Sequence, residues 1–110
     1  MAERALVTGI SGHVGRHLGR FLRAEGCHVV GLDRRPPQGD ICDDFIQCDL
    51  LEAEALKRAL HPFGLFDCLV HLAAIVAPTD LPDHAVLEVN VVGTYNILAA
   101  AGLKPGGRLV

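Results

Sequence analysis

Short apolar runs alternate with amphipathic stretches along the whole chain of 110 residues. Apolar runs of strand length predict strands at residues 4–10, 27–33, 43–50, 67–74 and 106–110. Apolar residues that recur at helical spacing predict helices at residues 12–26, 51–63 and 83–102. Strands that alternate with helices in this way predict a parallel sheet with right-handed crossovers.

The expected fold class is α/β, a Rossmann-type doubly wound parallel sheet with the strand order 3-2-1-4-5. In this order the direction of winding reverses between the first and fourth strands. The fifth apolar run has only begun at Val110. We therefore interpret residues 1–110 as the N-terminal part of a longer domain, truncated in its fifth strand.

The composition narrows the class of protein. The net charge is only −3 and no basic stripe is present, so we expect no nucleic-acid partner. No apolar run approaches the roughly 20 residues of a membrane span, so we expect no membrane partner. The first residues lead directly into a strand, without the basic flank and apolar stretch of a signal peptide, which favours a cytoplasmic location.

The cysteines and histidines show no metal-binding pattern. None of the four cysteines forms a C-x-x-C pair, and we expect reduced, structural thiols. His13 and His17 have a spacing that a metal ion allows on a helix, but no third ligand is identifiable, so no metal site is predicted. His71 lies within an apolar run, which favours a buried, hydrogen-bonded role over proton transfer.

Three evenly spaced glycines, Gly9, Gly12 and Gly15, join the first expected strand to the first helix. The backbone N–H groups and the dipole of a helix N-terminus favour a negatively charged group there. Gly9 would permit the tight turn, Gly12 the approach of a pyrophosphate, and Gly15 close packing of the helix. Asp33, at the end of the second strand, could accept hydrogen bonds from both hydroxyls of an adenosine ribose. The alternative is an ordinary helix-start loop followed by a solvated aspartate.

The spacing is G-x-x-G-x-x-G after a threonine, rather than the common G-x-G-x-x-G fingerprint. TGISGHVG, at residues 8–15, resembles the T-G-x-x-G-x-x-G signature of the extended short-chain dehydrogenase/reductases, the NAD-dependent epimerase/dehydratase family. Four further segments resemble that family in order and spacing: LDRR at 32–35, CDLLE at 48–52, DCLVHLAA at 67–74 and VNVVGTYNILAAA at 89–101.

The resemblance implies a set of cofactor contacts. Asp33 would take the ribose hydroxyls, Asp49 and the backbone of Leu50 would contact the adenine, and the end of the fourth strand would line the cofactor near its riboses. The cofactor-binding residues expected on this basis are Gly9, Ser11, Gly12, His13, Val14, Gly15, Asp33, Arg34, Asp49, Leu50, Leu72, Ala73 and Ala74.

Asn90 is the one candidate for a supporting catalytic role. The segment at 89–101 resembles a helix of that family, and the family's asparagine that corresponds to Asn90 helps to organise the active site. Independently, the side chains that share its helical stripe are Val86, Thr94, Ile97 and Ala101. An asparagine on such a face needs a partner, because an unpaired buried amide costs about 1–3 kcal/mol. A purely structural hydrogen bond between the helix and a strand and a catalytic role both remain open.

The choice of cofactor depends on Asp33 and the two arginines that follow it. A carboxylate at the strand end repels the extra phosphate of NADP, which favours NAD. Arg34 and Arg35 could pair with that phosphate, so NADP stays possible.

The family's proton-transfer residues are not found in the chain. The resemblance implies a Ser or Thr and then Tyr-x-x-x-Lys, whereas position 99, four residues after the single tyrosine Tyr95, is Ala. The first hypothesis is therefore the dinucleotide-binding part of an NAD-dependent epimerase/dehydratase-type oxidoreductase, acting on a sugar nucleotide or a similar hydroxyl or carbonyl substrate. We expect the complete protein to be a homodimer and residues 1–110 alone to be inactive. The second hypothesis is a non-catalytic NAD(P)-binding redox sensor or scaffold.

Overall fold

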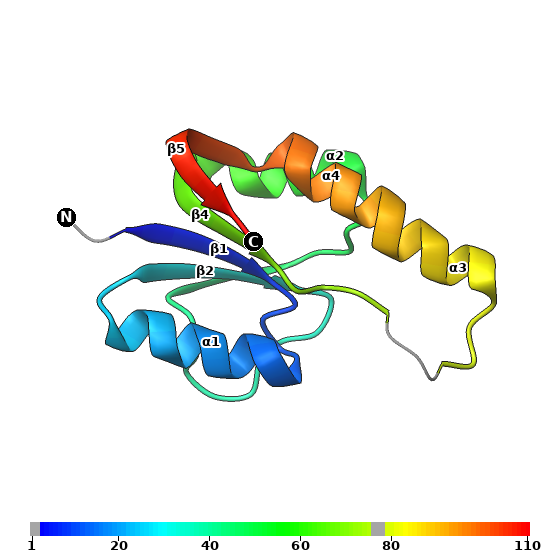
Figure 1. Ribbon diagram of the computed structural model, residues 1–110, viewed down its shortest axis with the longest axis horizontal. Coiled ribbons are helices and arrows are strands. Elements are labelled where there is room, and N and C mark those ends of the chain that lie inside the picture. Colours follow the sequence, from blue (N-terminus) through cyan, green and yellow to red (C-terminus); the bar gives the residue numbers. More distant parts are fainter. Residues whose placement is uncertain (1–2, 76–78) are drawn as a thin grey trace.

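The computed structural model describes residues 3–75 and 79–110. Its strands form one parallel sheet in the order β3-β2-β1-β4-β5 (Figure 1). They are β1 (Arg4–Thr8), β2 (His28–Asp33), β3 (Asp44–Gln47), β4 (Leu65–His71) and β5 (Gly102–Leu109). The Rossmann-type fold and the strand order expected from the sequence are confirmed.

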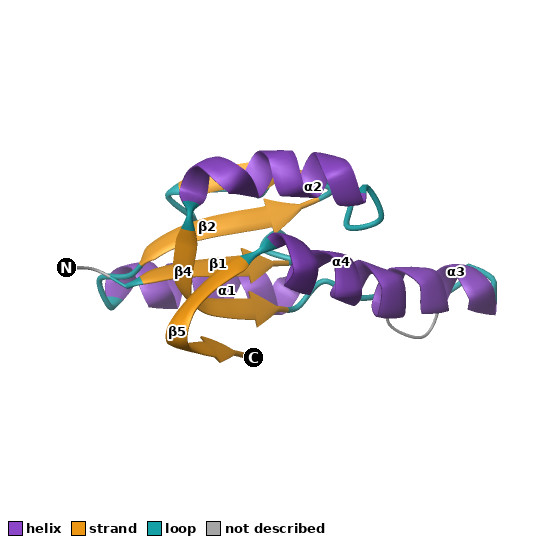
Figure 2. Cartoon of the chain, turned by 90° about the horizontal axis from the view of Figure 1, so that it is seen from above, coloured by secondary structure: helices purple, strands orange, loops and turns teal. Residues whose placement is uncertain are grey.

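Helices cover both faces of this sheet. One face carries α1, and the other carries α2 and α4 (Figure 1). A π-helical turn joins α3 to α4, so that the two form one continuous helix that extends beyond the sheet (Figure 2). The helical segments are α1 (His13–Ala24), α2 (Ala53–Leu60), the 3₁₀ turn η1 (His61–Phe63), α3 (Asp83–Leu87), the π turn η2 (Glu88–Val92) and α4 (Gly93–Ala100).

The hydrophobic core is divided between the two faces. Successive side chains of a strand point to opposite sides of a sheet. Leu6 of β1 therefore packs in the core beneath α2 and α4, together with Ile97, whereas its neighbour Val7 packs in the core beneath α1. The chain leaves β1 toward one face and β4 toward the other. A crevice therefore opens between them at the carboxyl ends of the strands, which is where ligands bind in open α/β sheets.

The start of the fifth strand was predicted wrongly. The helix ends at Ala100 and β5 begins at Gly102, whereas the sequence placed the helix end at residue 102 and the strand at 106–110. The register between β5 and β4 is irregular, and Gly106 takes a φ of 79°. Pro105 and Gly106 fit a bulge in an edge strand. Because they also interrupt the apolar run, the sequence pattern did not predict the first half of the strand.

Other predicted boundaries were too wide. β1 ends at Thr8 instead of residue 10, and β4 ends at His71 instead of residue 74. The helix expected at 51–63 begins at Ala53 and gives way to a 3₁₀ turn that contains Pro62, because proline cannot continue the hydrogen bonds of a helix interior. Among residues 3–75 and 79–110, no helix is both long and apolar enough to cross a membrane.

Candidate functional site

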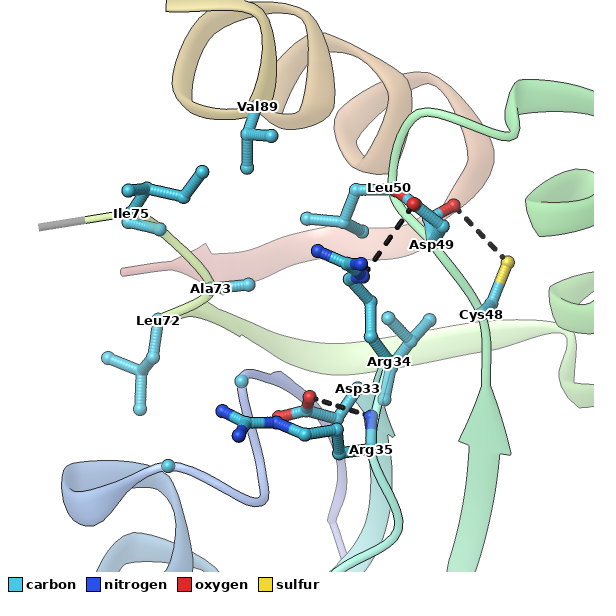
Figure 3. Close-up of a pocket in the computed structure, with 14 residues that line it drawn as sticks. Asp33, Arg34, Arg35, Cys48, Asp49, Leu50, Leu72, Ala73, Ile75 and Val89 are labelled. Carbon is cyan, nitrogen blue, oxygen red and sulfur yellow. Dashed lines mark hydrogen bonds and ion pairs between the residues drawn. The ribbon is translucent and has the colours of Figure 1, made fainter. Parts of the chain in front are cut away.

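A cavity of about 540 Å³ occupies the crevice at the carboxyl ends of β1, β2 and β4 (Figure 3). Most of the residues that the sequence predicted as cofactor contacts line it. They are Gly9, Gly12, Asp33, Arg34, Asp49, Leu50, Leu72, Ala73 and Ala74. The other predicted contacts, Ser11, His13, Val14 and Gly15, belong to the glycine loop and the first turn of α1 and do not line this cavity.

The three glycines of the loop are required for different reasons. Gly9 has a φ of 69°, and a Cβ there would lie 2.8 Å from the backbone nitrogen of Ala73. A Cβ on Gly15 would collide with the carbonyl oxygen of Gly9. A Cβ on Gly12 would meet only that same oxygen, at 3.2 Å. The fold therefore demands glycine at residues 9 and 15, whereas at residue 12 the missing side chain mainly keeps the cavity open.

The N-terminus of α1 lies beside the cavity. In the described part of the chain, no side chain caps this helix end, because the N-cap residue is Gly12. The first N–H groups of a helix have no partner within the helix and carry its positive dipole end. The side chains of His13 and Val14 are exposed, and Val14 keeps 61% of its surface in solvent. These two residues can therefore contribute backbone N–H groups to an anion in the crevice, but their side chains point away from the core.

Asp33 connects the end of β2 to the glycine loop. Its Oδ2 accepts the backbone N–H of Ser11 at 3.0 Å, and its Oδ1 accepts that of Arg35 at 3.1 Å. The Ser11 hydroxyl donates to the carbonyl oxygen of Arg35 at 2.6 Å. Since an ionised carboxylate offers about four lone-pair sites, Asp33 retains capacity for two further donors on the cavity side.

Arg34 and Asp49 face each other across one side of the cavity (Figure 3). Arg34 Nε lies 3.7 Å from Asp49 Oδ2, and both side chains are substantially exposed, so water and salt screen this ion pair strongly. Leu50 is buried beside them, and its carbonyl oxygen accepts a hydrogen bond of 2.8 Å from Nδ2 of Asn96. Because a carbonyl oxygen has two lone pairs, the backbone contact that the sequence predicted for Leu50 could come from its N–H group or from its carbonyl oxygen.

The opposite wall of the cavity is the segment that follows β4, residues 72–75. Asn90 holds its far end, because Oδ1 accepts the N–H of Ile75 at 2.8 Å and Nδ2 donates to the Ile75 carbonyl at 2.9 Å. Both sides of the Asn90 amide are thus satisfied by the backbone of Ile75, which lies in the segment after β4 and not in a strand. Asn90 lies in the π turn, a feature that is frequent at functional sites.

Arg35, which the sequence analysis considered only for the phosphate of NADP, also lines the cavity. Four apolar lining residues were missed by the sequence prediction: Leu32, Cys48, Ile75 and Val89. Each is a direct sequence neighbour of a predicted residue, and their apolar character suggested core rather than cavity. Cys48 is an example, because it is partly buried like a core residue and yet lines the cavity. Burial raises the pKa of its thiol, and its Sγ donates to the Asp49 carbonyl at 3.5 Å. The signal that could have found these residues is their position directly beside a predicted residue in the sequence.

Metal-ligating residues do not converge in the described ranges, 3–75 and 79–110, where no group of three or more His, Cys, Asp or Glu side chains is placed to hold an ion. The rings of His13 and His17 lie 5.3 Å apart, edge to face, on the exposed side of α1. All four cysteines are free thiols.

A doubly wound sheet, a glycine loop at a helix N-terminus and a carboxylate at the end of β2 together define a dinucleotide-binding Rossmann domain. The family model of the NAD dependent epimerase/dehydratase family matches residues 5–110. The chain belongs to this family, which confirms the resemblance stated from the sequence. The NAD prediction is thereby confirmed at the level of the family.

Three relatives illustrate the similarity. The coniferyl-alcohol dehydrogenase of a Pseudomonas species is 31% identical over 98% of this chain and 42% of its own length. A short-chain dehydrogenase from Leptospira borgpetersenii with bound NAD⁺ has a TM-score of 0.80 and 25% identity, covering 91% of this chain and 44% of that one. The UDP-glucose 4-epimerase of Thermus thermophilus in complex with NAD has a TM-score of 0.75 and 31% identity, covering 88% and 33%. The chain thus spans less than half of each relative.

Proposed function

We propose that this chain binds the adenosine and pyrophosphate half of NAD as the N-terminal part of an epimerase/dehydratase-type oxidoreductase. The observation that carries the proposal is the position of Asp33. Its carboxylate lines the cavity, is fixed by the backbone of Ser11 and Arg35, and keeps lone pairs for a ribose diol. Membership of an NAD-dependent family and the NAD-bound neighbours support the same assignment.

The proposed contacts follow the geometry of the cavity. Gly12 leaves room for the pyrophosphate, which the backbone N–H groups of the first turn of α1, from His13 to Gly15, would hold. Arg34, Asp49 and Leu50, which line one side of the cavity, would contact the adenine. The wall formed by Leu72, Ala73 and Ala74 would line the cofactor near its riboses. When bound, NAD supplies an acceptor that takes a hydride and can return it.

The substrate proposed for the complete protein is a small molecule with a reacting hydroxyl or carbonyl group, such as a sugar nucleotide. A UDP-glucose 4-epimerase is among the neighbours in structure, and a coniferyl-alcohol dehydrogenase is among the relatives in sequence. The chain contains no Tyr-x-x-x-Lys, and Tyr95 keeps 70% of its surface exposed on the helix that contains α4. We therefore propose that the group that exchanges a proton with the substrate lies outside residues 1–110.

The second candidate is a dinucleotide-binding redox sensor or scaffold without turnover. The two candidates differ in what the complete protein does with bound NAD. Formation of NADH with an alcohol or sugar-nucleotide substrate supports the enzyme. Tight binding of NAD or NADH without turnover on any such substrate supports the sensor.

NADP remains a proposed alternative cofactor. A second cavity of about 240 Å³ adjoins the glycine loop, and its lining includes Ser11, Arg16 and Arg35. Two guanidinium groups at this place suit a phosphate on the ribose. Asp33 opposes the same phosphate by charge repulsion. Calorimetric titration of the complete protein with NAD and with NADP tests both the function and the preference, and failure of both to bind would overturn the proposal.

We also propose that the complete protein forms a homodimer in the cytoplasm. Large apolar side chains are exposed in a row along α3, the π turn and α4. They are Leu87, Val91, Tyr95 and Leu98, which keep 61%, 61%, 70% and 43% of their surface in solvent. Several large apolar side chains exposed along one helix are typical of a surface that another protein covers. A molar mass of one subunit in light scattering at micromolar concentration would contradict the dimer.

A further inference from the structure

A buried threonine holds the near end of the cavity wall. Oγ1 of Thr8, a residue with no exposed surface, accepts the N–H of Leu72 at 3.0 Å and that of Ala73 at 3.2 Å. The same oxygen lies 2.6 Å from Nδ1 of His71. The two wall residues and His71 thus meet at one hydroxyl group.

The other ring nitrogen of His71 leads to the far end of the same wall. Nε2 lies 2.9 Å from Oγ1 of Thr94, and the Thr94 hydroxyl donates to the carbonyl oxygen of Asn90 at 2.6 Å. The side chain of Asn90 holds Ile75 by two hydrogen bonds. Thr8 thus holds the near end of segment 72–75, and Thr94 is connected to its far end through Asn90. His71 lies between the two threonines and bridges them.

The count of donors and acceptors determines which ring nitrogen carries the proton. Thr8 already accepts two N–H groups, so its own proton is left to donate, and Nδ1 of His71 must accept it. Thr94 uses its proton on the Asn90 carbonyl, so it accepts from Nε2 of His71. The imidazole is therefore neutral, with its proton on Nε2.

We propose that His71 is a positioning residue, whose Nε2–H tautomer couples Thr8 to Thr94 and so keeps the wall at residues 72–75 in the shape that the cofactor meets. The inference rests on the proposed function for the identity of that ligand. His71 does not line the cavity, so it acts through its neighbours and not by contact with the cofactor.

The surroundings of the imidazole suit this role. β1 presents the Thr8 hydroxyl to it, and the helix presents the Thr94 hydroxyl. The carbonyl of Val110, the residue after β5, accepts the His71 backbone N–H at 2.9 Å. Burial lowers the pKa of His71, and no charged side chain of the described residues adds to that shift. The neutral form is thus favoured independently of the hydrogen-bond count.

Two substitutions separate the two arms of the bridge. His71→Asn keeps an acceptor near the position of Nδ1 and loses the contact with Thr94. His71→Gln places a donor near the position of Nε2 and loses the acceptor for Thr8. In the complete protein, His71→Asn is expected to weaken NAD binding by about three- to tenfold, because the coupling to Thr94 is lost, and to speed amide exchange of Ile75. His71→Gln is expected to speed exchange of Leu72 and Ala73 and to weaken NAD binding about tenfold, the effect of one lost hydrogen bond.

The tautomer itself is measured by ¹⁵N NMR of the imidazole in the wild-type protein. A protonated Nε2 and an unprotonated Nδ1 at neutral pH are expected. Protonation at Nδ1 overturns the proposal. So does the same pattern of amide exchange in both variants, because a general loss of stability would give that pattern. If the wild-type protein binds no NAD, the proposed function fails instead, and the tautomer and the exchange pattern still decide whether His71 couples the two threonines.

Discussion

The backbone N–H of Ser11 donates to Oδ2 of Asp33 at 3.0 Å, which joins the glycine loop to the end of β2. The residue expected to recognise the ribose therefore also sets the position of the loop expected to hold the pyrophosphate. One carboxylate thus links two parts of the proposed cofactor site that are far apart in the sequence.

This dual role predicts the behaviour of Asp33→Asn. The amide oxygen can still accept one backbone N–H, so the fold should persist. The loss of a charged acceptor, at about 1.5–3 kcal/mol for a hydrogen bond to a charged group, should weaken NAD binding by about 10- to 100-fold. NADP binding should weaken less or improve, since the repulsion of its phosphate disappears. Calorimetry with both cofactors measures this, and Asp44→Asn, at the start of β3, is the matched control. Equal losses for NAD and NADP would contradict the assignment of Asp33.

A second prediction contrasts two glycines of the same loop. Gly12→Val should abolish detectable NAD binding while the protein remains folded, because the new side chain projects into the space proposed for the pyrophosphate. Gly15→Ala should unfold or severely destabilise the protein, because its Cβ would collide with the Gly9 carbonyl. Thermal unfolding and calorimetry distinguish the two effects. Unchanged NAD affinity in Gly12→Val would rule out the phosphate-loop interpretation.

The third prediction concerns Thr8. Replacing it by valine keeps the shape but leaves the N–H of Ala73 and Nδ1 of His71 without a partner. The N–H of Leu72 keeps only its longer hydrogen bond to the Thr8 carbonyl oxygen, at 3.3 Å. A buried donor or acceptor that loses its partner costs about 1–3 kcal/mol, so Thr8→Val should lower the free energy of unfolding by at least that amount. Thr8→Ser retains the hydroxyl and should lose less. Urea unfolding of both variants provides the comparison, and identical losses would show that the methyl group and not the hydroxyl matters.

The sequence was sufficient to predict the fold and much of the proposed site. Periodicity and glycine placement gave the alternation of strands and helices, and the topology places the ends of β1, β2 and β4 at one edge, where most of the predicted residues meet. These features depend on local patterns and on general rules of parallel sheets. They do not require knowledge of individual side-chain contacts.

The contacts that hold the site together could not be read from the sequence. The bridge through His71 depends on residues 8, 71 and 94 meeting in space, and hydrogen bonds between distant residues leave no periodic signal. The π turn around Asn90 was equally hidden, because an extra residue in one turn hardly alters the helical pattern. The bulge in β5 was missed because Pro105 and Gly106 break the apolar run.

Acid should weaken the fold through Asp67. This carboxylate accepts the backbone N–H of Arg4 at 2.7 Å and lies 3.1 Å from Nζ of Lys104, so it links β1, β4 and β5. These partners, the Arg4 N–H first, lower the pKa of Asp67 in the folded protein. Its stabilising contribution is therefore complete above the unfolded-state pKa of about 3.9 and is lost as the pH falls through the lower folded value. Asp67→Asn should flatten the acid side of the stability curve in urea unfolding, and an unchanged curve would contradict the assignment.

Residues 1–110 alone should show no oxidoreductase or epimerase turnover, even where they bind NAD. The residues of the proposed site bind and orient, through Asp33, the glycine loop and the wall at 72–75, whereas no Tyr-x-x-x-Lys is present to exchange a proton with a substrate. The measurement is NADH absorbance with alcohol, sugar and sugar-nucleotide substrates, with the complete protein as the positive control. Turnover by residues 1–110 would show that a described residue, with Asn90 or His71 the first to be mutated, transfers the proton itself.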